Sequence, residues 1–176
     1  MKKLYIFPVL MLVIFSSCKK SVSSSSQSSS PAASNSIYAL VDDAQVNLST
    51  KATAALGATL GNSLTVRGYT GNSGTPDEVI LTIFSKTPIT TGAYRRSSEG
   101  DNDVSAGIEY LQPGGMEYNS ANADLKSVNP LLIVITSIST TKVEGTFSGN
   151  LVSTCHAASH EKNVEDGRFS ATIAQQ

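Results

Sequence analysis

The side chains best suited to chemistry gather in one polar segment near the C-terminus, residues 153–166. It contains Cys155, His156 and His160, which include both histidines of the chain. Carboxylates are supplied by Glu161, Glu165 and Asp166. Thiolate, imidazole and carboxylate are ligands of zinc and related metals, so Cys155, His156 and His160 form a weak candidate metal site. Their spacing matches no standard zinc motif, and we therefore expect no bound metal and no other cofactor.

A thiol-dependent enzyme that uses Cys155 with a histidine base is another alternative for the 153–166 loop. A catalytic thiol needs a rigid, partly buried setting and a site that stabilises an oxyanion. A long polar loop supplies neither, so we predict an exposed, mobile loop with an ordinary thiol. The sequence favours a protein that is not an enzyme, with a metal-binding or thiol-dependent enzyme as the alternative.

An acidic cluster lies further upstream, where Glu99, Asp101 and Asp103 alternate with Gly and Asn. Such alternation is typical of the start of a calcium-binding loop. The twelve-residue loop also needs a glycine at its sixth position and a glutamate at its twelfth. Counted from Glu99, these positions hold Val104 and Tyr110. A turn flanked by solvated carboxylates is therefore the better interpretation.

Three tyrosines, Tyr94, Tyr110 and Tyr118, offer flat apolar faces with polar tips and could form a platform for stacking a sugar. Tyrosines on strands are more often half-buried sheet residues, and the chain has no Trp. We expect these three to be sheet residues, and we leave the ligand of the protein open.

The elements that must position these side chains are strands. Thr, Ser, Val and Ile are frequent, Gly and Asn punctuate the chain, and a helical period is not sustained. The expected strands cover residues 37–41, 46–54, 64–69, 78–85, 104–110, 116–118, 131–138, 142–152 and 168–173. We expect loops over residues 52–60, 88–92, 119–129 and 153–166.

Alternation assigns the faces of these strands. On residues 78–85, Val79, Leu81 and Ile83 share one face, while Ile80 and Phe84 share the other. Several other strands have an inward set of the same kind; these sets are Leu64, Val66 and Gly68; Val104, Ala106, Ile108 and Tyr110; Val143, Gly145, Phe147, Gly149 and Leu151; and Phe169, Ala171 and Ile173. The segment 131–138 is apolar on both faces, which is typical of a central strand.

This pattern predicts an all-β fold, a single antiparallel β-barrel or β-sandwich of about eight to nine strands. The strands 131–138, 142–152 and 168–173 should be neighbours. Two glycines, Gly145 and Gly149, fall on an inward face, which indicates strong coiling or the close approach of another element.

The same strands carry a family resemblance. The runs Ile133–Thr136, Lys142–Gly149 and Asp166–Phe169 are similar to I-x-I-T, G-T-F and closing G-x-F strands of uncharacterised Bacteroidota lipoproteins. Upstream, Gly92–Tyr94 and Ile108–Tyr110 resemble the G-x-Y and I-x-Y stretch of that family. These short motifs imply a fold and no chemistry, and the family provides no established catalytic residues.

The N-terminus has the features of an export signal. Lys2 and Lys3 precede a twelve-residue apolar run, Leu4–Phe15, which is too short to span a membrane, a task that takes about 20 residues. The order Phe15-Ser16-Ser17-Cys18 then resembles the lipobox of bacterial lipoproteins. The resemblance implies cleavage before Cys18, diacylglycerol on its sulfur and an acyl chain such as palmitate on the new amine.

The chain therefore divides into a signal peptide (1–17), a lipidated Cys18 with a Ser-rich linker (18–36) and one β domain (37–176). Ten of the sixteen residues from 21 to 36 are serine, which is typical of a flexible tether. The domain holds nine Lys and Arg against 14 Asp and Glu, a net charge of −5, and one cysteine, which excludes an intramolecular disulfide.

These features predict a lipid-anchored cell-envelope protein of the outer membrane, with a non-catalytic binding or structural-interaction role. The membrane, reached through the lipid on Cys18, is the first partner, and nucleic acid is not expected because no basic patch is present. An envelope protein or a glycan would be the further partner. Whether the protein faces the periplasm or the cell surface stays open.

Overall fold

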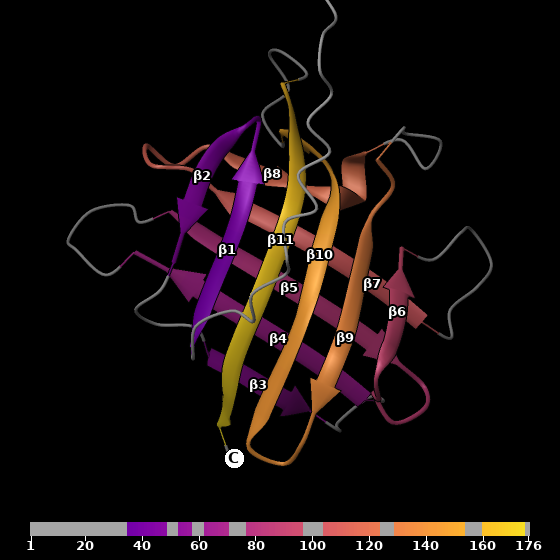
Figure 1. The fold of residues 1–176 in the computed structure, drawn as a ribbon. Coiled ribbons are helices and arrows are strands. Elements are labelled where there is room, and N and C mark those ends of the chain that lie inside the picture. The colour runs from indigo at the N-terminus through magenta and orange to yellow at the C-terminus, as the bar shows by residue number, and fades with distance from the viewer. Residues whose placement is uncertain are drawn as a thin grey trace, which may run out of the picture. The chain divides into compact units, whose positions relative to one another are not determined.

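The computed structural model describes residues 35–48, 53–57, 62–70, 77–96, 104–123, 129–153 and 160–174, which are mostly β-strand (Figure 1). The elements are β1 (Ser36–Val41), β2 (Ala44–Asn47), β3 (Thr53–Gly57), β4 (Asn62–Tyr69), β5 (Glu78–Ser85), β6 (Gly92–Arg95), β7 (Val104–Leu111), β8 (Glu117–Asn119), the 3-10 helix η1 (Ser120–Asn122), β9 (Leu132–Ile138), β10 (Lys142–Ser153) and β11 (Glu161–Ala174). The all-β class is confirmed, but these residues form eleven strands, more than the eight or nine expected. Among them, no helix is long and apolar enough to cross a membrane.

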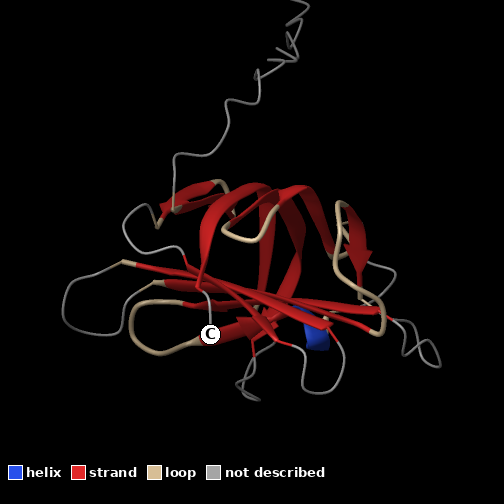
Figure 2. Cartoon of the chain, turned by 90° about the horizontal axis from the view of Figure 1, so that it is seen from below, coloured by secondary structure: helices blue, strands red, loops and turns tan. Residues whose placement is uncertain are grey.

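The strands form two packed layers that cross each other. Figure 1 shows β1, β2, β6, β9, β10 and β11 in the front layer, with β3, β4, β5, β7 and β8 running across behind them, and Figure 2 shows the two layers from below. Strand pairing nevertheless continues from one layer into the other. It passes through β11, β3, β4, β5, β7, β8 and β10 and returns to β11. The eleven strands thus belong to one sheet, which is arranged in two layers (Figure 1).

The long strands β10 and β11 are the centre of this arrangement. They pair with each other over most of their length. The end of β10 also pairs with β8, and the end of β11 pairs with β3, so each strand reaches the rear layer. The β11–β3 pairing is parallel, which corrects the expectation of a purely antiparallel fold. The predicted neighbours β9, β10 and β11 are confirmed.

The core lies between the layers, where the faces predicted from alternation meet. On β5, Val79, Leu81 and Ile83 are buried, whereas Phe84 is exposed. The inward residues predicted for β4, β10 and β11 are buried as well. Because side chains alternate with a period of two, an apolar set on every second residue defines the buried face. The two layers touch closely at Gly68, where an added Cβ would lie 2.8 Å from Cδ1 of Ile37 on β1.

Two glycines face two phenylalanines across β10 and β11. Gly145 pairs with Phe169, and Phe147 pairs with Gly167. A Cβ at Gly145 would overlap the Val134 carbonyl oxygen and lie 2.6 Å from the Phe169 ring. The two rings, with centroids 6.4 Å apart, therefore pack over positions that have no side chain. This close approach confirms the expectation drawn from the inward glycines.

Several loop and strand expectations were wrong. Residues 53–57 form β3 and residues 92–95 form β6, where loops or no strand had been expected. The predicted strand 46–54 is instead divided between two strands, β2 and β3. β2 pairs with β1 after the turn at Asp42-Asp43. The last strand begins at Glu161 rather than at Gly167, so residues 161–166 of the predicted loop 153–166 belong to β11.

A β-bulge in β11 explains the last of these errors. The register with both β1 and β10 shifts beside Asp166, whose φ is 49°. Val164 and Phe169 lie an odd number of residues apart, and a regular strand would place them on opposite faces. The extra residue of the bulge lets both face inward, and both are buried. The polar Glu165 and Asp166 lie at the bulge and are exposed.

Candidate functional site

The residues proposed as metal ligands are only partly within the described structure. His160 lies exposed immediately before β11, and its carbonyl oxygen accepts a hydrogen bond of 2.9 Å from the Ser153 N–H. Cys155 and His156 lie outside the described residues, as do Glu99, Asp101, Asp103 and the proposed lipidation site Cys18. Within the described ranges, no group of three or more His, Cys, Asp or Glu side chains is placed to hold a metal ion.

The three tyrosines considered as a sugar platform are core residues. Tyr94, Tyr110 and Tyr118 are 9%, 6% and 3% exposed. Their hydroxyls are hydrogen-bonded within the protein, to the Thr90 carbonyl oxygen at 2.8 Å, to Asp77 Oδ1 at 3.0 Å and to Met116 Sδ at 2.8 Å, respectively. A buried ring cannot offer its face to a ligand in solution. These tyrosines therefore act as the sheet residues that the sequence favoured.

Two of the tyrosines belong to a polar and aromatic cluster that joins the layers. The rings of Tyr110 on β7 and Tyr118 on β8 stack with centroids 6.3 Å apart. Lys162 Nζ, from β11, lies 5.7 Å from the centroid of the Tyr118 ring, within reach of a cation–π interaction. The same Nζ pairs with Asp42 Oδ2 at 2.6 Å, in the turn between β1 and β2. We call these four residues the interlayer cluster.

The ionisation of the interlayer cluster follows from its contacts. The hydrogen bond to Asp42 raises the pKa of Lys162 against the opposing effect of burial. Burial alone would raise the pKa of Asp42, but hydrogen bonds from Lys162 and from the Asn163 N–H, together with the lysine charge, lower it. Burial and the hydrogen bond to Asp77 raise the pKa of Tyr110, which stays neutral. Lys162 therefore stays protonated and forms a salt bridge with Asp42. A protonated lysine is not a nucleophile.

Amide side chains extend this cluster along the surface of β11. Asn163 donates from Nδ2 to Glu165 Oε1 at 2.6 Å, and its backbone N–H donates to Asp42 Oδ1 at 2.9 Å. Asn129 donates from Nδ2 to Asn163 Oδ1 at 2.6 Å and to the Val164 carbonyl oxygen at 3.0 Å. These bonds hold the start of β11 against β1 and against the segment before β9. Their role is to fix the geometry of this end of the sheet.

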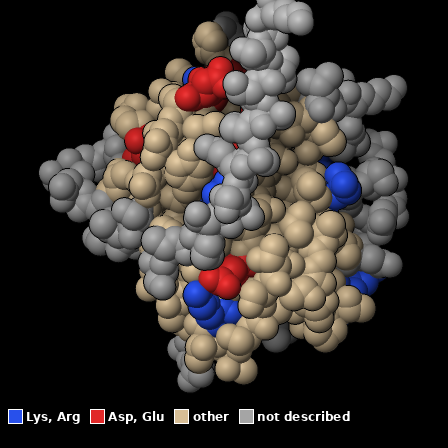
Figure 3. Space-filling model, in the orientation of Figure 1, with Lys and Arg blue, Asp and Glu red and all other residues tan. Residues whose placement is uncertain are grey.

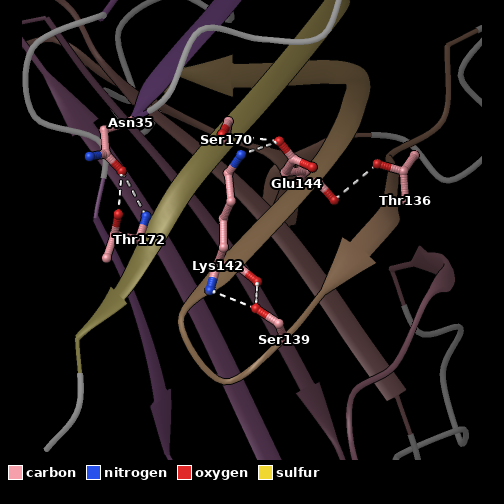
Figure 4. A network of polar contacts seen from close by, with 7 residues as sticks. All are labelled: Asn35, Thr136, Ser139, Lys142, Glu144, Ser170 and Thr172. Carbon is pink, nitrogen blue, oxygen red and sulfur yellow. Dashed lines mark hydrogen bonds and ion pairs between the residues drawn. The ribbon is translucent and has the colours of Figure 1, made fainter.

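A second polar network lies on the outer face of β9, β10 and β11. Figure 4 shows Lys142 reaching Glu144, at 2.7 Å between Nζ and Oε1, and the Ser170 hydroxyl 3.4 Å from the same carboxylate oxygen. The lysine hydrogen bond lowers the pKa of Glu144. In the same view, Asn35 Oδ1 accepts hydrogen bonds from the N–H and the hydroxyl of Thr172. These contacts tie β10 to β11 and fasten the chain before β1 to β11.

The surface shows dispersed charge. On the face drawn in Figure 3, Lys and Arg alternate with Asp and Glu among many uncharged residues, and no basic stripe of the kind that follows a nucleic acid crosses the described atoms. The outer face of the rear layer carries an exposed aromatic side chain, since Phe84 on β5 is 57% exposed. Alternation along 78–85 set Phe84 on the face opposite Val79, Leu81 and Ile83, but no further pattern distinguished it from the other aromatic residues.

Arg96 holds η1 against the layers, a contact that sequence reasoning missed. Its Nη1 donates to the Ser120 carbonyl oxygen at 2.7 Å and also to the Ala123 carbonyl oxygen. Ser120 Oγ in turn accepts a hydrogen bond of 2.9 Å from the Ile108 N–H. No sequence pattern around Arg96 indicates that its side chain would bind the carbonyl oxygens of η1 and Ala123.

Comparisons with models of known protein families, with curated proteins and with solved structures find no match to this chain.

Proposed function

We propose that this protein is a lipid-anchored component of the cell envelope, in the outer membrane, with a non-catalytic binding or structural-interaction role. The observation that carries the proposal is the position of Cys18, directly after a short apolar run and two small residues. A cysteine at this point is the acceptor that the lipobox resemblance implies. Two or three acyl chains hold a protein at a membrane stably, whereas one holds it only marginally.

The composition of the segment after Cys18 supports a β domain that is held at the membrane surface by a linker. Sixteen residues separate Cys18 from Asn35, the first described residue, and most of them are serine. A flexible chain of that length has a root-mean-square span of about 20–25 Å. The first strand, β1, begins at Ser36, where this composition ends. The linker would hold the β domain close to lipid headgroups and leave its surface accessible.

A binding role is favoured by the way the described polar groups are used. Lys162, Asp42 and Glu144 are engaged in ion pairs and hydrogen bonds that join strands, and the tyrosine hydroxyls are bonded inside the protein. Such groups stabilise a rigid scaffold. A rigid sheet that presents a fixed surface is suited to recognition.

Replacement of Cys18 tests the anchor. Cys18→Ala should move the protein from the membrane fraction to the soluble fraction, because no acyl chain can then be attached. Cys155→Ala, which removes the other cysteine, is the matched control and should leave the protein in the membrane fraction. A Cys18→Ala protein that still sediments with membranes after a high-salt wash would contradict the proposal.

The membrane face can be tested separately. Lys19 and Lys20 follow the anchor cysteine, where surface-exported lipoproteins of this group tend to carry acidic residues. We therefore propose the periplasmic face. Protease treatment of intact cells should leave the protein uncut, while the same treatment of permeabilised cells should degrade it. Cleavage in intact cells would place the domain on the cell surface.

A further inference from the structure

The outer face of β4, β5 and β7 carries one aromatic ring that the fold leaves open to solvent. Phe84 is 57% exposed, against 36% for Met116, and these two are the exposed large hydrophobic residues of the described chain. Phe84 lies on a regular strand paired on both sides, so its position is fixed by the ladder. Met116 instead lies in the turn between β7 and β8.

The neighbours of Phe84 on this face are small and carry hydroxyls. Phe84 pairs with Ser63 on β4 and with Ser105 on β7. Since neighbouring strands lie about 4.8 Å apart, a hydroxyl flanks the ring on each side at about the width of one sugar ring. The next outward residue of β5 is Thr82, which pairs with Thr65 and Gly107.

This surface carries no charged side chain on these two rows. The next row outward pairs Ile80 with Arg67 and Glu109, and Arg67 is neutralised by an ion pair to Glu78, with 3.0 Å between Nε and Oε1. Lys86 follows two residues beyond Phe84, past the end of β5. The region from Thr82 to Phe84 is therefore an uncharged surface between charged borders, which suits a neutral ligand. On the β7 side it is bordered by η1, to which Arg96 is hydrogen-bonded.

The amount of apolar surface decides between classes of ligand. A stable protein interface buries about 1,200–2,000 Å² around an apolar core, and a single ring between serines does not supply such a core. A lipid surface is also a poor match, because even a myristoyl chain alone gives only marginal membrane binding. A sugar ring needs less: one aromatic face for its C–H groups and hydroxyl partners at its rim.

We propose that the surface formed by Phe84, Ser63, Ser105, Thr65 and Thr82 binds a neutral glycan chain. One sugar stacks on Phe84 and bonds to the serine hydroxyls. The Gly107 end of the threonine row is closed, because the side chains of Thr82 and Ser120 lie 2.9 Å and 3.9 Å from the position that a Cβ at Gly107 would take. The inference deepens the proposed binding role by naming its ligand class. Many anchored copies along one polysaccharide would convert weak single contacts into firm attachment.

Affinity electrophoresis tests this proposal with the unlipidated mature chain from Cys18 onward. Native gels would contain dextran, soluble β-glucan, xyloglucan or galactomannan, each a neutral polysaccharide. We expect retardation of the unmodified sequence in at least one gel. Phe84→Ala should weaken the apparent affinity about fivefold or more, the size expected for one lost stacking contact. Met116→Ala is the matched control and should be retarded normally.

A second variant provides a direct signal from the same position. The chain contains no Trp, so Phe84→Trp places a single tryptophan on the proposed surface. Its emission should shift to shorter wavelength, in a saturable way, with the polysaccharide that retards the protein. Circular dichroism would confirm that both Phe84 variants are folded.

Three outcomes would overturn the inference: no retardation in any of the four gels, equal retardation of Phe84→Ala, or a Phe84→Trp emission shift caused by phosphatidylcholine vesicles and not by polysaccharide. The last would identify a lipid-binding face. Because the assay uses unlipidated protein, its result is independent of the anchor. Failure of the anchor would appear only in the membrane fractionation of Cys18→Ala.

Discussion

Replacement of Phe147 by alanine should show how much of the stability depends on the pair of phenylalanines over glycines. Phe147 is 3% exposed, and its ring packs against Gly167 and beside Phe169. Removing a buried phenylalanine ring costs about 3–5 kcal/mol, because transfer free energy is lost and a cavity remains. Since domains are stable by about 5–15 kcal/mol, Phe147→Ala would remove a large part of the free energy of unfolding.

Urea denaturation of the unlipidated mature chain, followed by far-ultraviolet circular dichroism, measures this change. With a urea slope of about 2 kcal/mol per molar, a loss of about 4 kcal/mol lowers the midpoint by about 2 M. Phe84→Ala is the matched control, because it removes the same ring from an exposed position. Its effect should stay within about 0.5 kcal/mol. Phe147→Leu, which retains part of the buried volume, should fall between the two.

The contrast between the two phenylalanines provides the refutation. If Phe147→Ala and Phe84→Ala lower the midpoint equally, the inward and outward faces of these strands have been misassigned. If Phe147→Ala changes stability by less than about 1 kcal/mol, the ring does not fill the space between the layers. A variant too unstable to fold would agree with the prediction, and Phe147→Leu would then give the measurable value.

Gly145→Ala should destabilise the domain by about 1–3 kcal/mol, measured in the same way, because its Cβ would meet the Val134 carbonyl oxygen and the Phe169 ring; a neutral effect would show that β9 and β10 can separate freely. The folded-state pKa of Asp42 is lowered, so its contribution to stability is present above the unfolded value of about 3.9 and is lost as pH falls through the folded value. Asp42→Asn should remove that part of the acid dependence and cost less than about 1 kcal/mol at neutral pH, since the pair is partly exposed; an unchanged acid profile would contradict the assignment. Elemental analysis of the purified protein should find no stoichiometric zinc, whereas one zinc per chain that is lost in a Cys155→Ala/His160→Ala double variant would support the metal-binding alternative.

The parts of the fold that followed from the sequence are those in which one face is buried. Along β5, β10 and the second half of β11, alternation alone identified the inward residues, because a one-residue shift would turn the whole apolar set outward. β3 and β6 were missed for the opposite reason. Segment 53–57 consists of small residues and one leucine, and 92–95 places one buried side chain, Tyr94, toward the core. Their strand conformation depends on hydrogen bonds to neighbouring strands. β3 pairs with β4, and β6 pairs with β9, which is distant in sequence. No local pattern along either segment reveals these pairings.

The candidate sites were harder to predict than the fold. Tyr94, Tyr110 and Tyr118 have the same residue type as binding-site tyrosines, and only their partners inside the protein identify them as core residues. Phe84 shows the reverse case. Its outward position was predictable, but its significance depends on Ser63 and Ser105, which are brought beside it by pairing with two other strands.

The bulge at Asp166 explains why the first half of β11 and its contacts with the interlayer cluster were both missed. It determines which side chains of residues 161–165 face the core. Without it, alternation that places Phe169 inward would place Lys162 and Val164 outward, and the polar sequence before Gly167 would indeed resemble a loop. With one extra residue, Val164 faces inward, and Lys162 on the same side reaches the Tyr118 ring and Asp42. An aspartate with φ of 49° tolerates the left-handed conformation better than most residues. Such a local backbone choice leaves little trace in the hydrophobic pattern, yet the interlayer cluster could not form without it.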